Sequence, residues 1–444
     1  MANQYGFELA AEREIEEINS TARLYTHTKS GARLLSLVND DENKVFCISF
    51  RTPPHDSTGL PHIMEHSVLC GSRKYPVKEP FVELVKGSLK TFLNAFTMPD
   101  RTIYPVASLN EKDFYNLVDV YLDAVFFPLI PQETLQQEGW HYELDQLDAP
   151  LAYKGVVFNE MKGVYSSPDG LLEKFSLQAL YPDTLYSNDY GGDPQEIPNL
   201  TYQQFRQFHQ TYYHPSNAYI FFSGDDPEEK RLQLLNSYLE AFDLRAVAAG
   251  IPPQPPFDAP RHAVFAYDTG GDQEKDKNYV LVNWMLPEFK DIELLLGLEI
   301  LSHVLLGSPA SPLRKILTES GLGEDLVGGG IDDSLMHISF STGMKGVSAE
   351  KTEQVERLIL ETLREQAAEG IDPDTVEASL NTIEFLLREN NTGAYPRGLV
   401  IFMRAIRDWI YQEDPFSPLA FEKPLENIKT RIQAGEKYLS CIHL

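Results

Sequence analysis

Cysteine is scarce in this sequence, and long apolar runs are missing. The chain has three cysteines in 444 residues, Cys47, Cys70 and Cys441, too few for a disulfide framework or a cysteine-based zinc site. Low cysteine use is typical of a reducing compartment, and no uncharged apolar run reaches the roughly 18 residues that a membrane-spanning helix needs. The first residues resemble neither a signal peptide nor an arginine-rich transit peptide. We therefore expect a cytoplasmic protein.

Basic side chains are also in short supply. The chain has 38 Lys and Arg against 66 Asp and Glu, a formal net charge of −28. Because like charges repel, such a chain is a poor partner for nucleic acid or for an anionic membrane surface. The acidic residues could attract basic ligands if they line a cavity, or they could serve solubility alone. Composition does not choose between these two interpretations.

The sequence does have the apolar content and the length for more than one core. Hydrophobic residues make up 42% of the chain and aromatic residues 11%, which is enough for full cores. A length of 444 residues is more than one ordinary domain uses. A stretch rich in Ala, Gly and Pro at 246–260 reads as a linker. We predict a first domain of residues 1–249 and a second of residues 250–444.

The order of predicted elements recurs on the two sides of this linker. In the first part, an apolar strand at 45–50 precedes a helix with histidines; in the second, a strand at 279–284 precedes a helix at 294–306. The second part therefore looks like a diverged copy of the first.

A His-x-x-Glu-His motif occupies the first of these two helices. Pro61 suits the first helical turn and Gly71 suits the position after the last one. His62 and His66 are four residues apart, so both imidazoles project from one face. Two imidazoles at this spacing can share one Zn²⁺, and the carboxylate of Glu65 can take a proton from water at the open position. This order of residues is the inverzincin motif.

The same pattern would also arise on an exposed helix face with two solvated histidines. With 11 histidines in the chain, a chance motif has a probability on the order of a few per cent. Further along, residues 155–165 read as a helix whose apolar positions leave Glu160 as the acid among them. Spacing alone does not select it over four other acids, which are Glu133, Glu138, Glu143 and Glu173.

Two strand-like runs follow the motif. Residues 90–97 and 101–107 flank a Met-Pro-Asp turn and are predicted to form a hairpin. Pro105 lies in the second run and indicates an edge or a bulge, because proline cannot donate to the ladder. Taken alone, Asn94 is an ordinary polar residue of a turn or a strand edge.

Four strings of residues together resemble the pitrilysin–insulinase metallopeptidases, and within them the presequence protease branch. They are Phe50-Arg-Thr-Pro-Pro, His62-Ile-Met-Glu-His-Ser-Val-Leu-Cys-Gly-Ser-Arg-Lys-Tyr-Pro, Thr91-Phe-Leu-Asn-Ala-Phe-Thr and Gly155-Val-Val-Phe-Asn-Glu-Met-Lys-Gly-Val-Tyr-Ser-Ser-Pro. The resemblance implies an α+β fold of two homologous domains. Each is expected to be a mainly antiparallel sheet with helices packed on one face, and the first is expected to carry the site.

The resemblance also implies a role for each matching residue. Three residues are expected to hold one Zn²⁺ per chain: His62, His66 and Glu160. Glu65 is the expected general base and then the proton donor to the leaving amine. Three residues are expected to bind the peptide as an added strand: Asn94, Ala95 and Phe96. A strand edge reads main chain, so cleavage should tolerate many side chains.

The resemblance covers only the first half of such enzymes. Their second, C-terminal half closes a chamber around unfolded peptides and supplies an Arg and a Tyr that hold the scissile carbonyl, and we find no match to these residues. Losing oxyanion donors typically costs a factor of about 10² to 10³. We expect a zinc-dependent endopeptidase for short unstructured peptides that is weak or inactive without a second half or a homologous subunit. The alternative is a non-catalytic scaffold or a peptide-binding subunit of the same fold.

Overall fold

The computed structural model describes most of the chain and divides it into two compact units. The described residues are 5–78, 80–144, 146–269, 277–286, 291–390, 393–436 and 438–441. Unit 1 consists of Met1–Pro260 and Asn391–Ile406, and unit 2 of Arg261–Asn390 and Arg407–Leu444. The sequence-based division into homologous domains, 1–249 and 250–444, stays a prediction.

One mixed sheet forms the centre of unit 1. Its strands are β1 (Phe7–Ile15), β2 (Ser20–His27), β3 (Arg33–Val38), β4 (Lys44–Arg51), β5 (Lys90–Leu93), β6 (Phe96–Met98), β7 (Arg101–Ser108) and β10 (Ala218–Gly224). The order is β1-β2-β3-β10-β4-β7-β5, and β6 also pairs with β7. Among the strand pairs of this sheet in the described residues, only β10–β3 is parallel. Every residue of β4 is buried, which explains its continuous apolar run.

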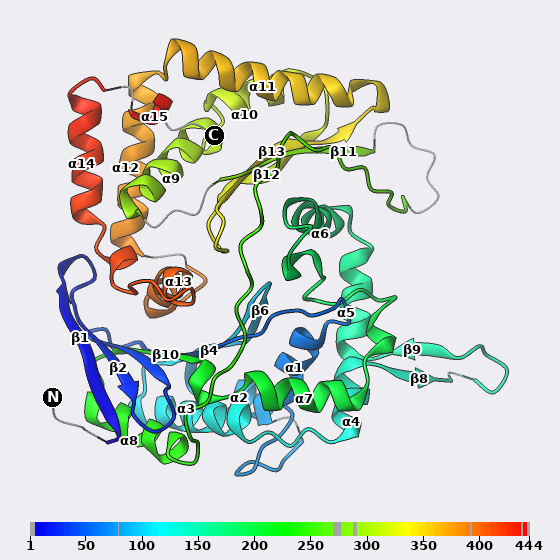
Figure 1. The fold of residues 1–444 in the computed structure, drawn as a ribbon, viewed down its shortest axis with the longest axis vertical. Helices are drawn as coiled ribbons and strands as arrows, with labels where there is room; N and C mark the ends of the chain where they lie inside the picture. Colours follow the sequence, from blue (N-terminus) through cyan, green and yellow to red (C-terminus); the bar gives the residue numbers. More distant parts are fainter. Residues whose placement is uncertain are drawn as a thin grey trace. The chain divides into compact units, whose positions relative to one another are not determined.

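The helices of unit 1 pack mainly on one face of this sheet, and the start of α13 (Arg397–Trp409) lies on the other face. They are α1 (Leu60–Val68), α2 (Pro80–Gly87), α3 (Glu111–Phe126), α4 (Gln132–Thr134), α5 (Val156–Tyr165), α6 (Pro168–Leu180), α7 (Tyr202–Tyr212), α8 (Glu228–Leu239) and the start of α13. Phe222 of β10 packs on Phe114 of α3 with ring centroids 6.0 Å apart, whereas its neighbour Phe221 packs on Phe402 of α13 at 5.2 Å. Successive strand residues point to opposite faces, so α3 and α13 lie on opposite sides (Figure 1).

Short turns and one hairpin complete unit 1. The 3₁₀ turns are η1 (Glu16–Ile18), η3 (Leu185–Ser187), η4 (Ile197–Asn199) and η5 (Pro215–Asn217), and η2 (Leu135–Gly139) is a π-helical turn. β8 (His141–Glu143) and β9 (Ala152–Lys154) form a two-stranded hairpin that extends outward beside α5 (Figure 1).

The outer strand of the sheet is broken where it faces a proline. β5 ends at Leu93 and β6 begins at Phe96, and both pair with β7. Between them, the amide of Asn94 donates to the carbonyl of Pro105 at 3.3 Å. Because Pro105 has no amide hydrogen, the ladder is interrupted on its partner strand. The predicted hairpin and irregularity are confirmed, but Pro105 itself lies in an inner strand.

Unit 2 has a smaller antiparallel sheet in the order β11-β13-β12. Its elements are β11 (Asn278–Met285), α9 (Ile292–Leu306), α10 (Pro312–Glu319), β12 (Asp325–Asp332), β13 (Ser339–Val347), η6 (Ala349–Lys351), α11 (Thr352–Glu369), α12 (Pro373–Glu389), η7 (Ser417–Leu419), α14 (Glu422–Gln433) and α15 (Tyr438–Cys441). The predicted α+β class is confirmed. None of the helices in the described residues is long and apolar enough to cross a membrane.

Candidate metal centre

Helix α1 places two imidazoles side by side. Ile63, Met64 and Val68 are fully buried in the core of unit 1, which orients the opposite face of the helix outward. On that face the ring centroids of His62 and His66 lie 5.0 Å apart. The predicted helix and its paired histidines are therefore present in the structure.

Helix α5 brings a carboxylate to the same point. Val157 and Met161 anchor this helix in the core, and Glu160 projects from its half-exposed side. Its Oε2 atom lies 3.8 Å from Nε2 of His62 and 3.8 Å from Nε2 of His66. Among the residues that the structure describes, these three side chains are the one group of His, Cys, Asp or Glu with the compactness of a metal site.

The three donor atoms fit a zinc ion. Zinc prefers imidazole nitrogens and carboxylate oxygens at about 2.0–2.2 Å, so tetrahedral ligand atoms are separated by roughly 3.4 Å. The observed separations, 3.8 Å twice and at most 4.8 Å overall, exceed that value slightly. If all three side chains held one zinc ion, one position would remain for water or substrate, as in catalytic zinc sites.

Glu138 holds the far side of His66. Its Oε2 atom lies 3.3 Å from Nδ1 of His66, and its Oε1 atom accepts hydrogen bonds from Gln137 at 2.8 Å and from the thiol of Cys70 at 3.5 Å. Burial by itself would lower the pKa of His66, but the hydrogen bond to Glu138 and the surrounding carboxylates raise it above 6.5. Spacing left Glu138 open as a metal ligand; the structure puts it at the other nitrogen of the imidazole.

A backbone carbonyl group engages Nδ1 of His62, as Glu138 engages Nδ1 of His66. Nδ1 of His62 lies 3.0 Å from the carbonyl oxygen of Gly191. The loop is held in turn by Asp189, whose Oδ1 accepts from the amides of Gly191 and Gly192 at 3.0 and 3.1 Å. Both imidazoles therefore have Nδ1 engaged by a protein acceptor, which leaves Nε2 of each directed toward Glu160.

Glu65 lies beside the two histidines and is tied to the sheet edge. Its side chain is 8% exposed and accepts a hydrogen bond of 2.5 Å from the hydroxyl of Thr97 in β6. The sequence did not indicate Thr97 or the Gly191 carbonyl, and it offered Glu138 only as one of several possible metal ligands. Glu138 lies in the π-helical turn η2, a feature often found at functional sites, but no pattern in the sequence indicates that turn.

The predicted peptide-binding residues lie at the outer strand. Asn94 and Ala95 fill the break between β5 and β6, and Phe96 begins β6. The carbonyl of Asn94 accepts from the hydroxyl of Tyr121 at 3.2 Å, while its side chain is exposed. Within the residues described, β5 and β6 pair with β7 on one side and with no strand on the other. Their outer side is therefore a free sheet edge.

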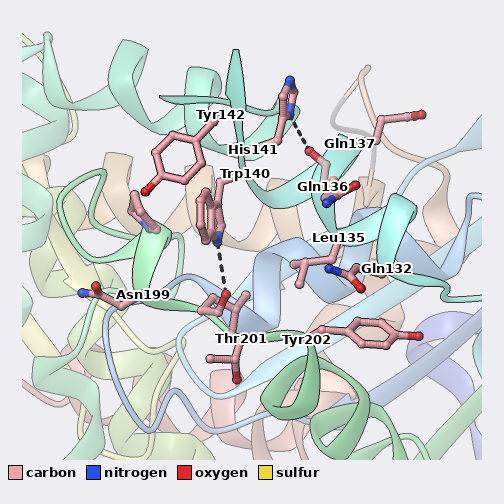
Figure 2. A pocket seen from close by; sticks show the side chains of 12 residues that line it. Gln132, Leu135, Gln136, Gln137, Trp140, His141, Tyr142, Asn199, Thr201 and Tyr202 are labelled. Carbon is pink, nitrogen blue, oxygen red and sulfur yellow. Dashed lines mark hydrogen bonds between the residues drawn. The ribbon is translucent and has the colours of Figure 1, made fainter. Parts of the chain in front are cut away.

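One hollow lies at the site and a second lies elsewhere in unit 1. The first, of about 300 Å³, is lined by His62, Glu65 and Glu160 and extends toward α6. The other, of about 730 Å³, lies behind η2 and is lined by aromatic and carboxamide side chains such as Trp140 and Gln136 (Figure 2). Among its lining residues neither Asp, Glu, Lys nor Arg occurs, and His141 is the one imidazole.

An inverted His-x-x-Glu-His helix with a distal carboxylate, on an α+β fold, defines the inverzincin class of peptidases. Residues 50–161 match the family described as insulinase (peptidase family M16), and residues 199–383 match the peptidase M16 inactive domain. The chain belongs to peptidase family M16, the pitrilysin–insulinase family, and it is similar to the presequence proteases within it.

Three relatives illustrate the similarity. Presequence protease 1, chloroplastic/mitochondrial, of Arabidopsis thaliana is 57% identical over 98% of this chain and 41% of its own length. Protein HypA of Clostridium perfringens is 46% identical, over 97% and 44%. The mitochondrial presequence protease of Danio rerio is 37% identical, over 96% and 42%. The chain therefore spans about two fifths of the length of these relatives.

Solved structures share the fold at low sequence identity. A protease from Helicobacter pylori superposes with a TM-score of 0.70 at 18% identity, covering 91% of this chain and 94% of its own. Pitrilysin superposes with a TM-score of 0.65 at 16% identity, covering 97% of this chain and 46% of its own. These likenesses show the fold alone.

The expectation of a cytoplasmic location is wrong. The relatives from Arabidopsis thaliana and Danio rerio carry chloroplastic or mitochondrial names, while another relative is bacterial. The expectation rested on the low cysteine count and on the first residues of the chain. A low cysteine count indicates a reducing environment but does not distinguish one reducing compartment from another.

Proposed function

We propose that this chain is the catalytic portion of a zinc-dependent endopeptidase that cleaves short unstructured peptides. The observation that carries the proposal is the convergence of His62, His66 and Glu160 within 4.8 Å of one another, with Glu65 next to them in the same helix. These residues would hold one Zn²⁺. When bound, zinc supplies Lewis-acid polarisation of a water molecule and of the scissile carbonyl.

Glu65 is the proposed proton carrier. Its carboxylate takes a proton from the attacking water and then gives it to the leaving amine. Thr97 donates to one oxygen of this carboxylate at 2.5 Å, which restricts the orientation of the carboxylate. A general base needs such orientation, because proton transfer requires a heavy-atom approach of about 2.6–3.2 Å.

The peptide would bind along the outer edge of β5 and β6. Main-chain groups of an extended peptide pair with a free strand edge, so affinity depends little on side chains. Thr97 lies on this strand and contacts Glu65, so a peptide paired there would pass close to the base. Asn94, Ala95 and Phe96 would supply the pairing groups.

Full activity is proposed to require a second part. The relatives are more than twice as long as the matched region, and the remainder, or a homologous subunit, would close a chamber around the peptide. Without its oxyanion donors the rate would fall by a factor of about 10² to 10³. The alternative is a scaffold or a peptide-binding subunit, for which four site residues kept together have no use.

Replacing Glu65 with Gln tests the proposal. Metal content by atomic spectroscopy should remain one zinc per chain, and binding of a labelled unstructured peptide should persist. Cleavage, assayed with and without the remaining portion of a full-length relative, should fall by at least about 10²-fold. Wild-type protein that binds no zinc, or cleavage that survives in Glu65→Gln, would exclude this mechanism.

A further inference from the structure

Three aromatic rings gather on the side of the outer strand that faces away from the metal centre. Phe92 of β5 and Phe96 of β6 have ring centroids 6.3 Å apart. The ring of Tyr395 lies 5.6 Å from Phe92 and 6.2 Å from Phe96, in edge-to-face geometry. We call these three residues the aromatic cluster. Tyr395 belongs to unit 1 although it lies about 300 residues further along the chain.

The alternation of the strand separates this cluster from the catalytic residues. Leu93 and Ala95 pack against the core of unit 1, and Thr97 bonds to Glu65. Phe92 and Phe96 occupy the other phase of the strand, as the period of two requires. The outer strand therefore has a catalytic face and an aromatic face.

The aromatic cluster is accessible in a way that core rings are not. Tyr395 is 46% exposed, and Phe92 and Phe96 are partly exposed. Neither phenylalanine is among the buried residues of the core. Exposed rings that contact one another at a free sheet edge lose water when an apolar group covers them, which favours binding.

A peptide added to this edge would alternate in the same way as the strand. Every second side chain would point toward the catalytic face, and the side chains between them would lie level with Phe92, Phe96 and Tyr395. Side chains two residues apart are then on the same face, whereas adjacent ones are on opposite faces. The cluster would meet only one of these two sets.

We propose that the aromatic cluster is a selectivity site that favours peptides with apolar or aromatic side chains two residues apart. The inference rests on the proposed peptide binding at the β5–β6 edge and adds a substrate class to it. Main-chain pairing gives affinity for any extended peptide. The aromatic cluster adds a preference for apolar side chains at every second position of that peptide. Tyr395 is then a specificity-determining residue from a distant part of the chain.

The test uses the full chain carrying Glu65→Gln, loaded with zinc so that peptides bind without being cut. Two fluorescent peptides of identical composition are compared, one with phenylalanines at positions i and i+2, the other at i and i+1. By fluorescence anisotropy the first should bind about five- to tenfold more tightly. Tyr395→Ala should bring this ratio close to one, and Tyr395→Phe should keep it.

Tyr142→Ala is the matched control, because Tyr142 is also an exposed tyrosine of unit 1 but lies on the β8–β9 hairpin. It should leave the ratio unchanged. If Tyr395→Ala does not fold by circular dichroism, Phe92→Thr, which suits a strand, takes its place. An equal ratio in the parent and in Tyr395→Ala overturns the selectivity site while peptide binding stands. Loss of all peptide binding in the zinc-loaded parent overturns the proposed function and the inference with it.

Discussion

The hydroxyl of Thr97 donates a hydrogen bond of 2.5 Å to the carboxylate of Glu65. The two residues are 32 positions apart and belong to different elements, helix α1 and the outer strand β6. One side chain thus connects the proposed general base to the strand that would bind the peptide. If the peptide binds there, its position and the orientation of the proposed base would be coupled through this bond.

Replacing Thr97 with Val should therefore lower the rate of cleavage and leave zinc binding intact. Valine has the shape of threonine without its hydroxyl, so the packing of β6 is kept while the carboxylate of Glu65 loses its donor. We expect kcat to fall about tenfold, which is less than the roughly 10²- to 10⁴-fold that a general base itself contributes. Thr97→Ser keeps the donor and serves as the control. Equal kcat values for Thr97→Val and wild type would contradict the orienting role.

Glu138→Gln should weaken zinc binding about 10- to 100-fold, because a carboxylate that accepts from a metal-bound imidazole raises its basicity and sets its orientation. The measurement is competition with a chromogenic chelator. Glu133→Gln is the control, since Glu133 is exposed in the neighbouring α4. Equal affinities in the two variants would show that Glu138 does not act on His66.

Gly59→Ala should destabilise unit 1 by about 2 kcal/mol or more. Gly59 caps α1 with φ of 68°, and an added Cβ would lie 2.6 Å from the carbonyl oxygen of Gly191. The substitution would also displace the carbonyl that holds His62. Gly163→Ala, in α5 with open space around it, should instead stabilise by about 0.5–1 kcal/mol. Denaturant unfolding measures both, and equal effects would refute the steric argument.

Stability should decrease as the pH falls from about 6.5 to 4. Burial lowers the pKa of His209 from 6.5 to about 4, even though its Nε2 donates to the carbonyl of Val125 at 2.8 Å. The unfolded chain binds a proton throughout this range and the folded chain does not, so protons favour unfolding. The loss is up to about 3 kcal/mol for this residue.

His209→Gln keeps a donor for Val125 but removes the titration. Its free energy of unfolding should depend less on pH between 6.5 and 4 than that of the wild type. Urea unfolding at a series of pH values provides the measurement, and parallel pH profiles for the two proteins would rule out His209 as the cause.

Much of the fold was predictable because its elements carry strong local patterns. The α1 helix begins beside Pro61 and has an apolar face, although it ends at Val68, before Gly71, and β4 is a continuous apolar run. The strand predicted at 279–284 is confirmed by β11 (Asn278–Met285). Strand β1 (Phe7–Ile15) was missed, because four of its nine residues are charged and it lies at the edge of the sheet.

The local sequence pattern was sufficient to predict that the two imidazoles lie together with Glu65 beside them. A helix of 3.6 residues per turn places residues four apart on one face whatever surrounds it. The local pattern could not select which distant acid lies beside the two histidines. Packing of α5 brings Glu160 to Nε2 of both histidines, while the π-helical turn η2 brings Glu138 to Nδ1 of His66. Contacts between residues far apart in the chain depend on how the elements pack, and no spacing rule encodes them. The same holds for Tyr395, which joins Phe92 and Phe96 only because the start of α13 packs on the sheet of unit 1.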